Sequence, residues 1–87
     1  MNEIDIYTTA VCGYCVAAKN YLRSRGLTWN EKRIDTDPSL REEMQRRAPG
    51  SRTVPQIFIN DSHVGGYDDM MAKVRDGSLE TLLQAPE

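Results

Sequence analysis

The spacing of hydrophobic positions changes shortly after the start of the chain. Over residues 4–8, apolar and polar side chains alternate, which is typical of a short strand. Over residues 15–25 the period lengthens, because Ala18 and Leu22 lie four positions apart on one helix face. Gly26 stands where such a helix would end. The pattern predicts a strand followed directly by a helix.

A second helix is predicted in the middle of the chain. Asp37 can cap the free N–H groups of a helix, and Pro38 has a backbone angle that suits the first helical position. Arg46 and Arg47 fall in the last predicted turn, where positive charge complements the helix dipole, and we expect both to be solvated. Residues 49–50, a Pro-Gly pair, stop the helix.

The other segments predict three more strands and a helical C-terminal region. Residues 28–34 hold apolar side chains among charged ones, so we expect a strand in an exposed or edge position. Residues 56–59 predict a buried strand, and residues 63–64 predict the returning strand of a hairpin. A last helical region is predicted from about Asp68, and Ser78 can cap a final turn.

The order of these elements, βαβαββα, limits the architecture. A right-handed βαβ unit gives two parallel strands, and the later hairpin adds two antiparallel ones. We therefore expect an α/β fold with a small four-stranded mixed sheet and helices on both faces. A chain of 87 residues suffices for one core, so residues 1–87 are predicted to form a single domain.

Charge and hydropathy exclude several classes of partner. The formal net charge is −2 and the sequence pI is about 5.3, whereas non-specific nucleic-acid binding normally needs a basic face. No apolar run approaches the roughly twenty residues that span a bilayer, and the N-terminus lacks the basic and apolar pattern of a signal peptide. We expect no nucleic-acid or membrane partner and a cytoplasmic location.

The candidate chemistry lies in the only two cysteines, Cys12 and Cys15, which Gly13 and Tyr14 separate. Cys12 is predicted at or just before the first helical position, where free N–H groups and the helix dipole favour a negative charge. Thiolate is the nucleophile of disulfide exchange, and the spacing lets Cys15 attack a mixed disulfide formed on Cys12. Since the cytosol keeps thiols reduced, the pair indicates reversible redox chemistry.

Two other interpretations of the cysteines are weaker. A structural disulfide would close a loop of four residues, and such a short loop restricts the unfolded chain little. A structural zinc site usually needs four Cys or His ligands, and His63 is the only histidine that could join the two thiols.

Three motifs in one order and spacing make the chain resemble the glutaredoxins of the thioredoxin superfamily. Tyr7-Thr8 precedes the cysteines, the sequence Thr-Val-Pro-Gln-Ile-Phe-Ile fills residues 53–59, and Gly-Gly-Tyr-Asp-Asp fills residues 65–69. The resemblance covers nearly the whole chain. It implies a thioredoxin-like fold and a glutathione-dependent thiol–disulfide oxidoreductase that reduces protein disulfides and glutathione mixed disulfides.

The resemblance also implies a role for each residue of the site. Cys12 would be the nucleophile and Cys15 the resolving cysteine of a dithiol member. A cis peptide bond at Pro55 would set the backbone of Val54 beside the cysteines, where it pairs with glutathione like an added strand. The other residues implied to contact glutathione are Tyr14 and Thr53 along the groove, Arg52 and Gln56 toward the glycyl carboxylate, and Gly66, Tyr67 and Asp68 toward the γ-glutamyl end.

Departures from the usual family pattern leave a second function open. Gly13 stands where many dithiol members have Pro, Thr9 where many have Lys, and Tyr67 where a smaller residue is common. Some members with Gly or Ser between the cysteines resemble iron–sulfur carriers. In these, two chains share a two-iron, two-sulfur cluster through one cysteine each, here Cys12, and two glutathiones. We expect a monomer, or a cluster-bridged dimer under this alternative.

Overall fold

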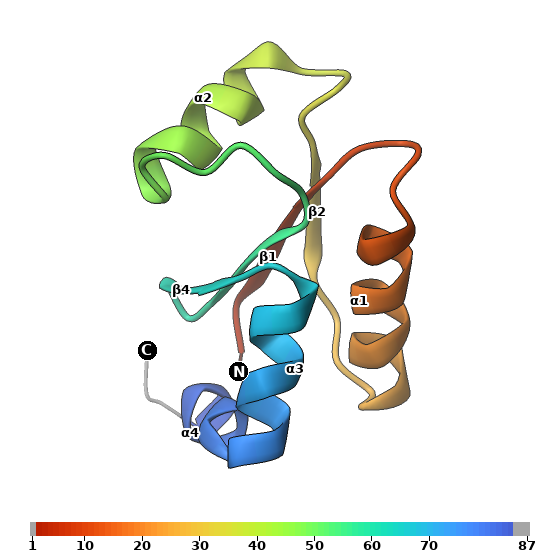
Figure 1. The fold of residues 1–87 in the computed structure, drawn as a ribbon, viewed down its shortest axis with the longest axis vertical. Helices are drawn as coiled ribbons and strands as arrows, with labels where there is room; N and C mark the ends of the chain where they lie inside the picture. Colours follow the sequence, from red (N-terminus) through yellow and green to blue (C-terminus); the bar gives the residue numbers. More distant parts are fainter. Residues whose placement is uncertain (1, 85–87) are drawn as a thin grey trace.

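The computed structural model describes residues 2–84, so residue 1 and residues 85–87 of the predicted domain lie outside the described part. Figure 1 shows the arrangement of the helices and strands. In chain order the elements are β1 (Ile4–Thr8), α1 (Gly13–Ser24), β2 (Asn30–Arg33), α2 (Pro38–Arg47), β3 (Gln56–Ile59), β4 (Ser62–Gly65), α3 (Tyr67–Asp76) and α4 (Ser78–Gln84).

The four strands form one mixed sheet in the order β2-β1-β3-β4. Strand β1 runs parallel to β2 and antiparallel to β3, and β4 returns antiparallel to β3. The predicted α/β architecture and mixed sheet are therefore confirmed, and β2 occupies an edge as expected. Strand β2 is shorter than predicted, since residues 28–29 precede its first paired residue.

Alternation along the two central strands divides the core between the faces of the sheet. Ile6 of β1 and Ile57 of β3 pack in a cluster with residues of α1, α3 and α4, such as Leu22. Tyr7 and Phe58, one position further along each strand, pack on the other face with residues of α2. Figure 1 shows α2 set apart from the other three helices. Helices cover both faces, as the order of the elements predicted.

The predicted ends of the first two helices are confirmed by their hydrogen bonds. Gly26 has φ +70°, and its N–H donates to the Arg23 carbonyl at 3.0 Å. The N–H of Leu27 donates to the Leu22 carbonyl, also at 3.0 Å, which completes a Schellman motif. At the start of α2, the Asp37 carboxylate accepts the Ser39 N–H at 3.0 Å.

The C-terminal helical region differs from the prediction. It begins at Tyr67, and it consists of two helices rather than one helix and a final turn. Gly77 separates α3 from α4 with φ +84°, a left-handed conformation that ends the first helix. Leu79 of α4 then packs in the core with Met70 of α3, so burial of apolar side chains holds the second helix in place.

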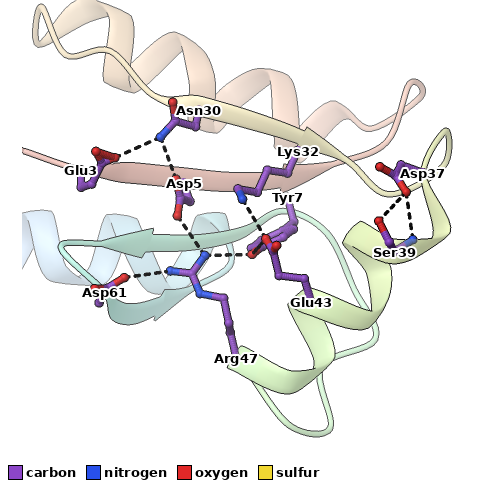
Figure 2. A network of polar contacts seen from close by, with 10 residues as sticks. All are labelled: Glu3, Asp5, Tyr7, Asn30, Lys32, Asp37, Ser39, Glu43, Arg47 and Asp61. Carbon is purple, nitrogen blue, oxygen red and sulfur yellow. Dashed lines mark hydrogen bonds and ion pairs between the residues drawn. The ribbon is translucent and has the colours of Figure 1, made fainter.

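Arg47 corrects the expectation that both arginines at the end of α2 are solvated, because it lies inside a polar network (Figure 2). Its guanidinium donates to Asp5 at 2.9 Å and to the Tyr7 hydroxyl at 2.8 Å. It also lies 4.0 Å from the centre of the Phe58 ring. The partners belong to β1 and β3, which are distant in sequence, so helical position alone gave no sign of them. Arg46 is exposed, as predicted.

The network continues from Arg47 through the hydroxyl of Tyr7, whose side chain is buried. This hydroxyl donates to Glu43 at 2.5 Å, and the same carboxylate accepts Lys32 Nζ at 2.8 Å (Figure 2). The Tyr7 hydroxyl thus joins two ion pairs. Asp5 and Arg47 link β1 to α2, and Lys32 and Glu43 link β2 to α2. The polar groups of this network that are removed from water are thus paired with one another, as burial of charged strand positions beneath a helix requires.

Of the helices between residues 2 and 84, none has the length and apolar composition to cross a membrane.

Replacing Arg47 by Ala should lower the free energy of unfolding by about 1–3 kcal/mol, because Asp5 and the Tyr7 hydroxyl lose a partner while they stay partly buried. Arg46→Ala is the matched control, since its exposed side chain should contribute within about 0.5 kcal/mol. Urea unfolding of the two variants measures the difference. Equal values would contradict the role given to the network.

Candidate functional site

Cys12 is the residue that immediately precedes α1. Its backbone is extended, with φ −152° and ψ 103°, and its sulfur accepts the N–H of Cys15 at 3.1 Å. The sulfur therefore takes the place of a capping oxygen at the N-terminus of the helix. The side chain is partly exposed, so an outside disulfide can approach it.

Cys15 lies one turn further along α1 and is only 1% exposed. Burial, followed by the hydrogen bond and charge of Cys12, raises the pKa of the Cys15 thiol to about 12. Neither cysteine is in a disulfide. The two thiols are thus unequal: one is accessible at a helix N-terminus, and the other is buried and holds its proton.

A cis peptide bond joins Val54 to Pro55, in a segment that lies beside the cysteines. The Val54 carbonyl oxygen lies 3.7 Å from the Cys12 sulfur. Pro55 is buried, Val54 is half-buried and Thr53 is exposed, so the segment has one side on the core and one side open. The sequence placed Val54 beside the cysteines, and the structure confirms that position.

The paired glycines lie at the start of α3, and Gly65 is held close to the Asp69 carboxylate. Gly65 has φ +110°, and a Cβ there would lie 2.4 Å from an Asp69 carboxylate oxygen. The N–H of Gly66 donates to the same oxygen at 2.9 Å, so Asp69 caps the helix. Tyr67 and Asp68 are the first two residues of α3, and their N–H groups have no acceptor within the helix.

Two tyrosines form a wall of the site between α1 and α3. The rings of Tyr14 and Tyr67 stack with centroids 6.0 Å apart and planes 28° apart. With Gly13 and Ala17 they line a largely apolar hollow of about 340 Å³. A Cβ added at Gly13 would meet nothing within 4 Å, so packing does not require a glycine at this position. Without a side chain, Gly13 leaves the hollow open.

Arg52 and Gln56, both predicted to face a carboxylate, differ in their surroundings. Arg52 is exposed and forms no ion pair within residues 2–84. Gln56 is only 6% exposed, and its amide nitrogen donates to the Thr53 carbonyl at 3.1 Å and to Thr53 Oγ1 at 3.4 Å. Its amide oxygen lies 2.7 Å from His63 Nε2. Gln56 is thus engaged with protein groups, whereas Arg52 is free to meet a ligand.

The segment before Cys12 has an anchor that the sequence analysis missed. Asp35 accepts the Ala10 N–H at 3.0 Å and two hydrogen bonds from Arg33, at 2.7 and 2.8 Å. The Arg33 guanidinium holds the pKa of the Asp35 carboxyl well below its usual range. Because Asp35 lies 25 positions after Ala10, it is the parallel pairing of β1 with β2 that brings the two together.

Metal ligands do not gather at the cysteines or elsewhere in residues 2–84. Within that range no three His, Cys, Asp or Glu side chains are placed to hold a metal ion in one chain.

Sequence comparison gives relatives over nearly the whole length of the chain. The sequence model of the glutaredoxin family matches residues 4–64. A glutaredoxin of Pseudomonas aeruginosa is 49% identical over 85 residues, which are 98% of this chain and 100% of the relative. Glutaredoxin 3 of Escherichia coli K12 is 45% identical over 84 residues, 97% of this chain and 100% of the relative.

Solved structures agree with the sequence relatives. A glutaredoxin of Brucella melitensis superposes with a TM-score of 0.79 at 45% identity, covering 94% of this chain and 88% of that one. A complex of buckwheat glutaredoxin with glutathione superposes with a TM-score of 0.83 at 30% identity, covering 94% of this chain and 76% of that one. With these relatives and the thioredoxin-like arrangement of its sheet and helices, the chain belongs to the glutaredoxin family of thiol–disulfide oxidoreductases.

Proposed function

We propose that this glutaredoxin uses glutathione to reduce protein disulfides and mixed disulfides between proteins and glutathione. Cys12 is the nucleophile and Cys15 the resolving cysteine. The buckwheat relative was solved in complex with glutathione, which supports glutathione as the partner of this chain too. Glutathione acts here as a co-substrate, so the reaction needs no resident cofactor.

The observation that best supports the proposal is that Cys12 and Cys15 differ in accessibility and in hydrogen bonding. The Cys12 sulfur is accessible and accepts an N–H at the N-terminus of α1, whereas Cys15 is buried with a raised pKa. Attack on an outside disulfide requires an accessible sulfur that can carry negative charge. Only Cys12 meets both conditions, so the first bond to the substrate forms there.

Reduction of a glutathionylated protein then takes two exchanges. The Cys12 thiolate attacks the glutathionyl sulfur, the protein thiolate leaves, and a Cys12–glutathione disulfide remains. A glutathione thiolate next attacks the glutathionyl sulfur on Cys12, releasing oxidised glutathione and the Cys12 thiolate. Across the two exchanges, the glutathionyl group of the substrate and one free glutathione have become oxidised glutathione, and the substrate cysteine has been reduced to a thiol. Cys15 takes no part in this route.

Reduction of a protein disulfide uses Cys15 as well. The Cys12 thiolate forms a mixed disulfide with the substrate, and Cys15 attacks the Cys12 sulfur to release the second substrate thiol. Because burial raises the pKa of Cys15, this thiol must lose its proton during the step, and the leaving substrate thiolate is a suitable acceptor. Two glutathiones then reduce the internal disulfide.

We assign the glutathione groove to the surface between the Pro55 segment and the start of α3. The Val54 backbone lies beside the sulfur and offers strand-like pairing there, and the N–H groups of Tyr67 and Asp68 suit the γ-glutamyl carboxylate. Arg52 suits the glycyl carboxylate because it has no ion pair within residues 2–84. The remaining residues proposed to line the groove are Tyr14, Thr53, Pro55 and Gly66.

The proposed substrates place this chemistry in a reducing compartment. Reduced glutathione maintains free thiols in the cytosol, so we propose that the protein acts there on glutathionylated or disulfide-containing proteins. A monomer suffices for both routes, since the two cysteines belong to one chain.

The iron–sulfur alternative would use Cys12 differently. A two-iron, two-sulfur cluster bridged between two chains needs only one thiolate from each, and the accessible Cys12 sulfur fits that requirement. When bound, such a cluster would supply a transferable iron–sulfur unit. The buried Cys15 thiol lies behind the Cys12 sulfur and fits a resolving role better than a ligand role.

Single cysteine substitutions test the two routes. In steady-state reduction of a glutathionylated peptide, Cys12→Ser should lower the rate at least about a thousandfold, to the uncatalysed level, because the nucleophile is lost. Cys15→Ser should retain most of the rate, because this route does not use Cys15. Loss of activity in Cys15→Ser would contradict the mechanism.

The same preparations distinguish the iron–sulfur alternative. After anaerobic purification with glutathione, the proposed oxidoreductase should be a colourless monomer with robust turnover. A visible absorption band in a dimer that turns over negligibly would instead make cluster binding the principal function.

Alkylation measures the inequality of the thiols without any substrate. At pH 8, iodoacetamide should modify native Cys12 and leave Cys15 free. A pKa of about 12, against an ordinary value of 9.0 for a thiol, lowers the thiolate fraction of Cys15 about a thousandfold. Reaction at Cys15 should increase as the pH rises toward 12. Mass spectrometry counts the adducts, with urea-unfolded protein as the control that should carry two. Two rapid adducts on the native protein at pH 8 would contradict the assignment.

A further inference from the structure

We infer that Gln56 and His63 are positioning residues that hold the Thr53 wall of the groove in place. The inference rests on the proposed function, because Thr53 and Val54 form the segment along which glutathione would pair. It changes the role expected for Gln56, which acts here through Thr53 rather than by touching the glycyl carboxylate.

Three polar contacts form a chain from the sheet edge to the groove. His63 of β4 contacts the Gln56 amide oxygen at 2.7 Å, and the amide nitrogen donates to the Thr53 carbonyl at 3.1 Å and to Thr53 Oγ1 at 3.4 Å. Gln56 is only 6% exposed. The polar atoms of this amide are therefore satisfied by protein groups on both sides, and the exposed residue Thr53 is tied to a buried one.

The direction of each hydrogen bond follows from the Thr53 carbonyl, which can only accept. The amide nitrogen of Gln56 must face this carbonyl, so the amide oxygen faces His63. Nε2 of His63 therefore carries the proton in the neutral ring. Both the neutral ring in this tautomer and the protonated ring donate to Gln56, so the contact does not depend on the charge of His63.

Packing holds the donor ring where the amide needs it. The His63 ring stacks on Phe58 with centroids 4.8 Å apart and planes 28° apart, and Phe58 is buried beneath α2. The guanidinium of Arg47 also lies over Phe58, at 4.0 Å. His63 is thus an exposed residue with a fixed ring, and its Nε2–H meets the Gln56 oxygen without a further loss of side-chain freedom.

Removal of His63 leaves a buried amide oxygen without its donor. The Gln56 side chain then gains by turning toward water, which withdraws its nitrogen from Thr53. Thr53 then loses the hydrogen bonds that tie it to Gln56. A ligand that pairs with the Thr53 and Val54 backbone must then order it on binding, and the entropy lost in that ordering weakens binding. The reacting Cys12 sulfur is unchanged.

Kinetics in the Cys15→Ser background isolate this effect. In reduction of a glutathionylated peptide, His63→Ala and Gln56→Met should each raise KM about threefold to tenfold, the range of one lost hydrogen bond, with kcat little changed. His63→Gln, which restores an N–H donor, should recover part of the loss. Ser62→Ala, an exposed position on the same strand, is the matched control and should leave KM unchanged. An unchanged KM in both His63→Ala and Gln56→Met would overturn the inference, as would a fall in kcat alone.

Nuclear magnetic resonance tests the contact chain without glutathione, so its failure can be told from failure of the proposed function. The ¹⁵N shifts of neutral His63 should show a proton on Nε2, and the Gln56 side-chain amide protons should exchange faster with solvent in His63→Ala than in Ser62→Ala. A proton on Nδ1, or equal exchange in the two variants, would overturn the inference. If these signatures hold while the unmodified protein shows no glutathione-dependent turnover, the proposed function fails and the positioning of Thr53 stands.

Discussion

The antiparallel register between β1 and β3 is the constraint on which the rest of the structure depends. Tyr7 pairs with Gln56, so the chain leaving β1 toward Cys12 and the chain entering β3 from Pro55 meet at one end of the sheet. The contact of 3.7 Å between the Cys12 sulfur and the Val54 carbonyl follows from that pairing. A slip of one residue would exchange the two faces of β3, moving Ile57 to the α2 face and Phe58 to the face covered by α1, α3 and α4, so that both core clusters would lose their packing. The hydrophobic core therefore fixes the site as well as the fold.

Each face of the sheet supports one part of the site. On the face covered by α1, α3 and α4, apolar packing brings the N-termini of α1 and α3 together, with Tyr14 stacked on Tyr67. On the α2 face, Tyr7 and Arg47 join the helix to the strands through hydrogen bonds and ion pairs. Phe58 connects this network to His63, and Gln56 continues it to Thr53. The groove is thus supported from both faces of the sheet: by hydrogen bonds and ion pairs on the α2 face, and by the apolar packing of α1 and α3 on the other face.

Local patterns predicted what local physics determines. Alternation placed Ile6 and Tyr7 on opposite faces, and the caps at Cys12 and Asp37 marked two helix starts, because these features depend on neighbouring residues. The family motif predicted the cis bond before Pro55. The partners of Arg47 and Asp35 could not be predicted in this way, since they lie 42 and 25 positions away and meet only through strand pairing. The contact between His63 and Gln56 also forms only through strand pairing, so the sequence offered His63 only as a possible metal ligand.

The most direct test of the central claim is the position of glutathione in its mixed disulfide with Cys12 in the Cys15→Ser variant. Nuclear Overhauser contacts between labelled glutathione and the protein measure this position. The account predicts contacts from the cysteinyl backbone to Val54 and from the γ-glutamyl group to Tyr67 and Asp68. Contacts confined to Cys12 itself, with the rest of the tripeptide free in solution, would contradict it.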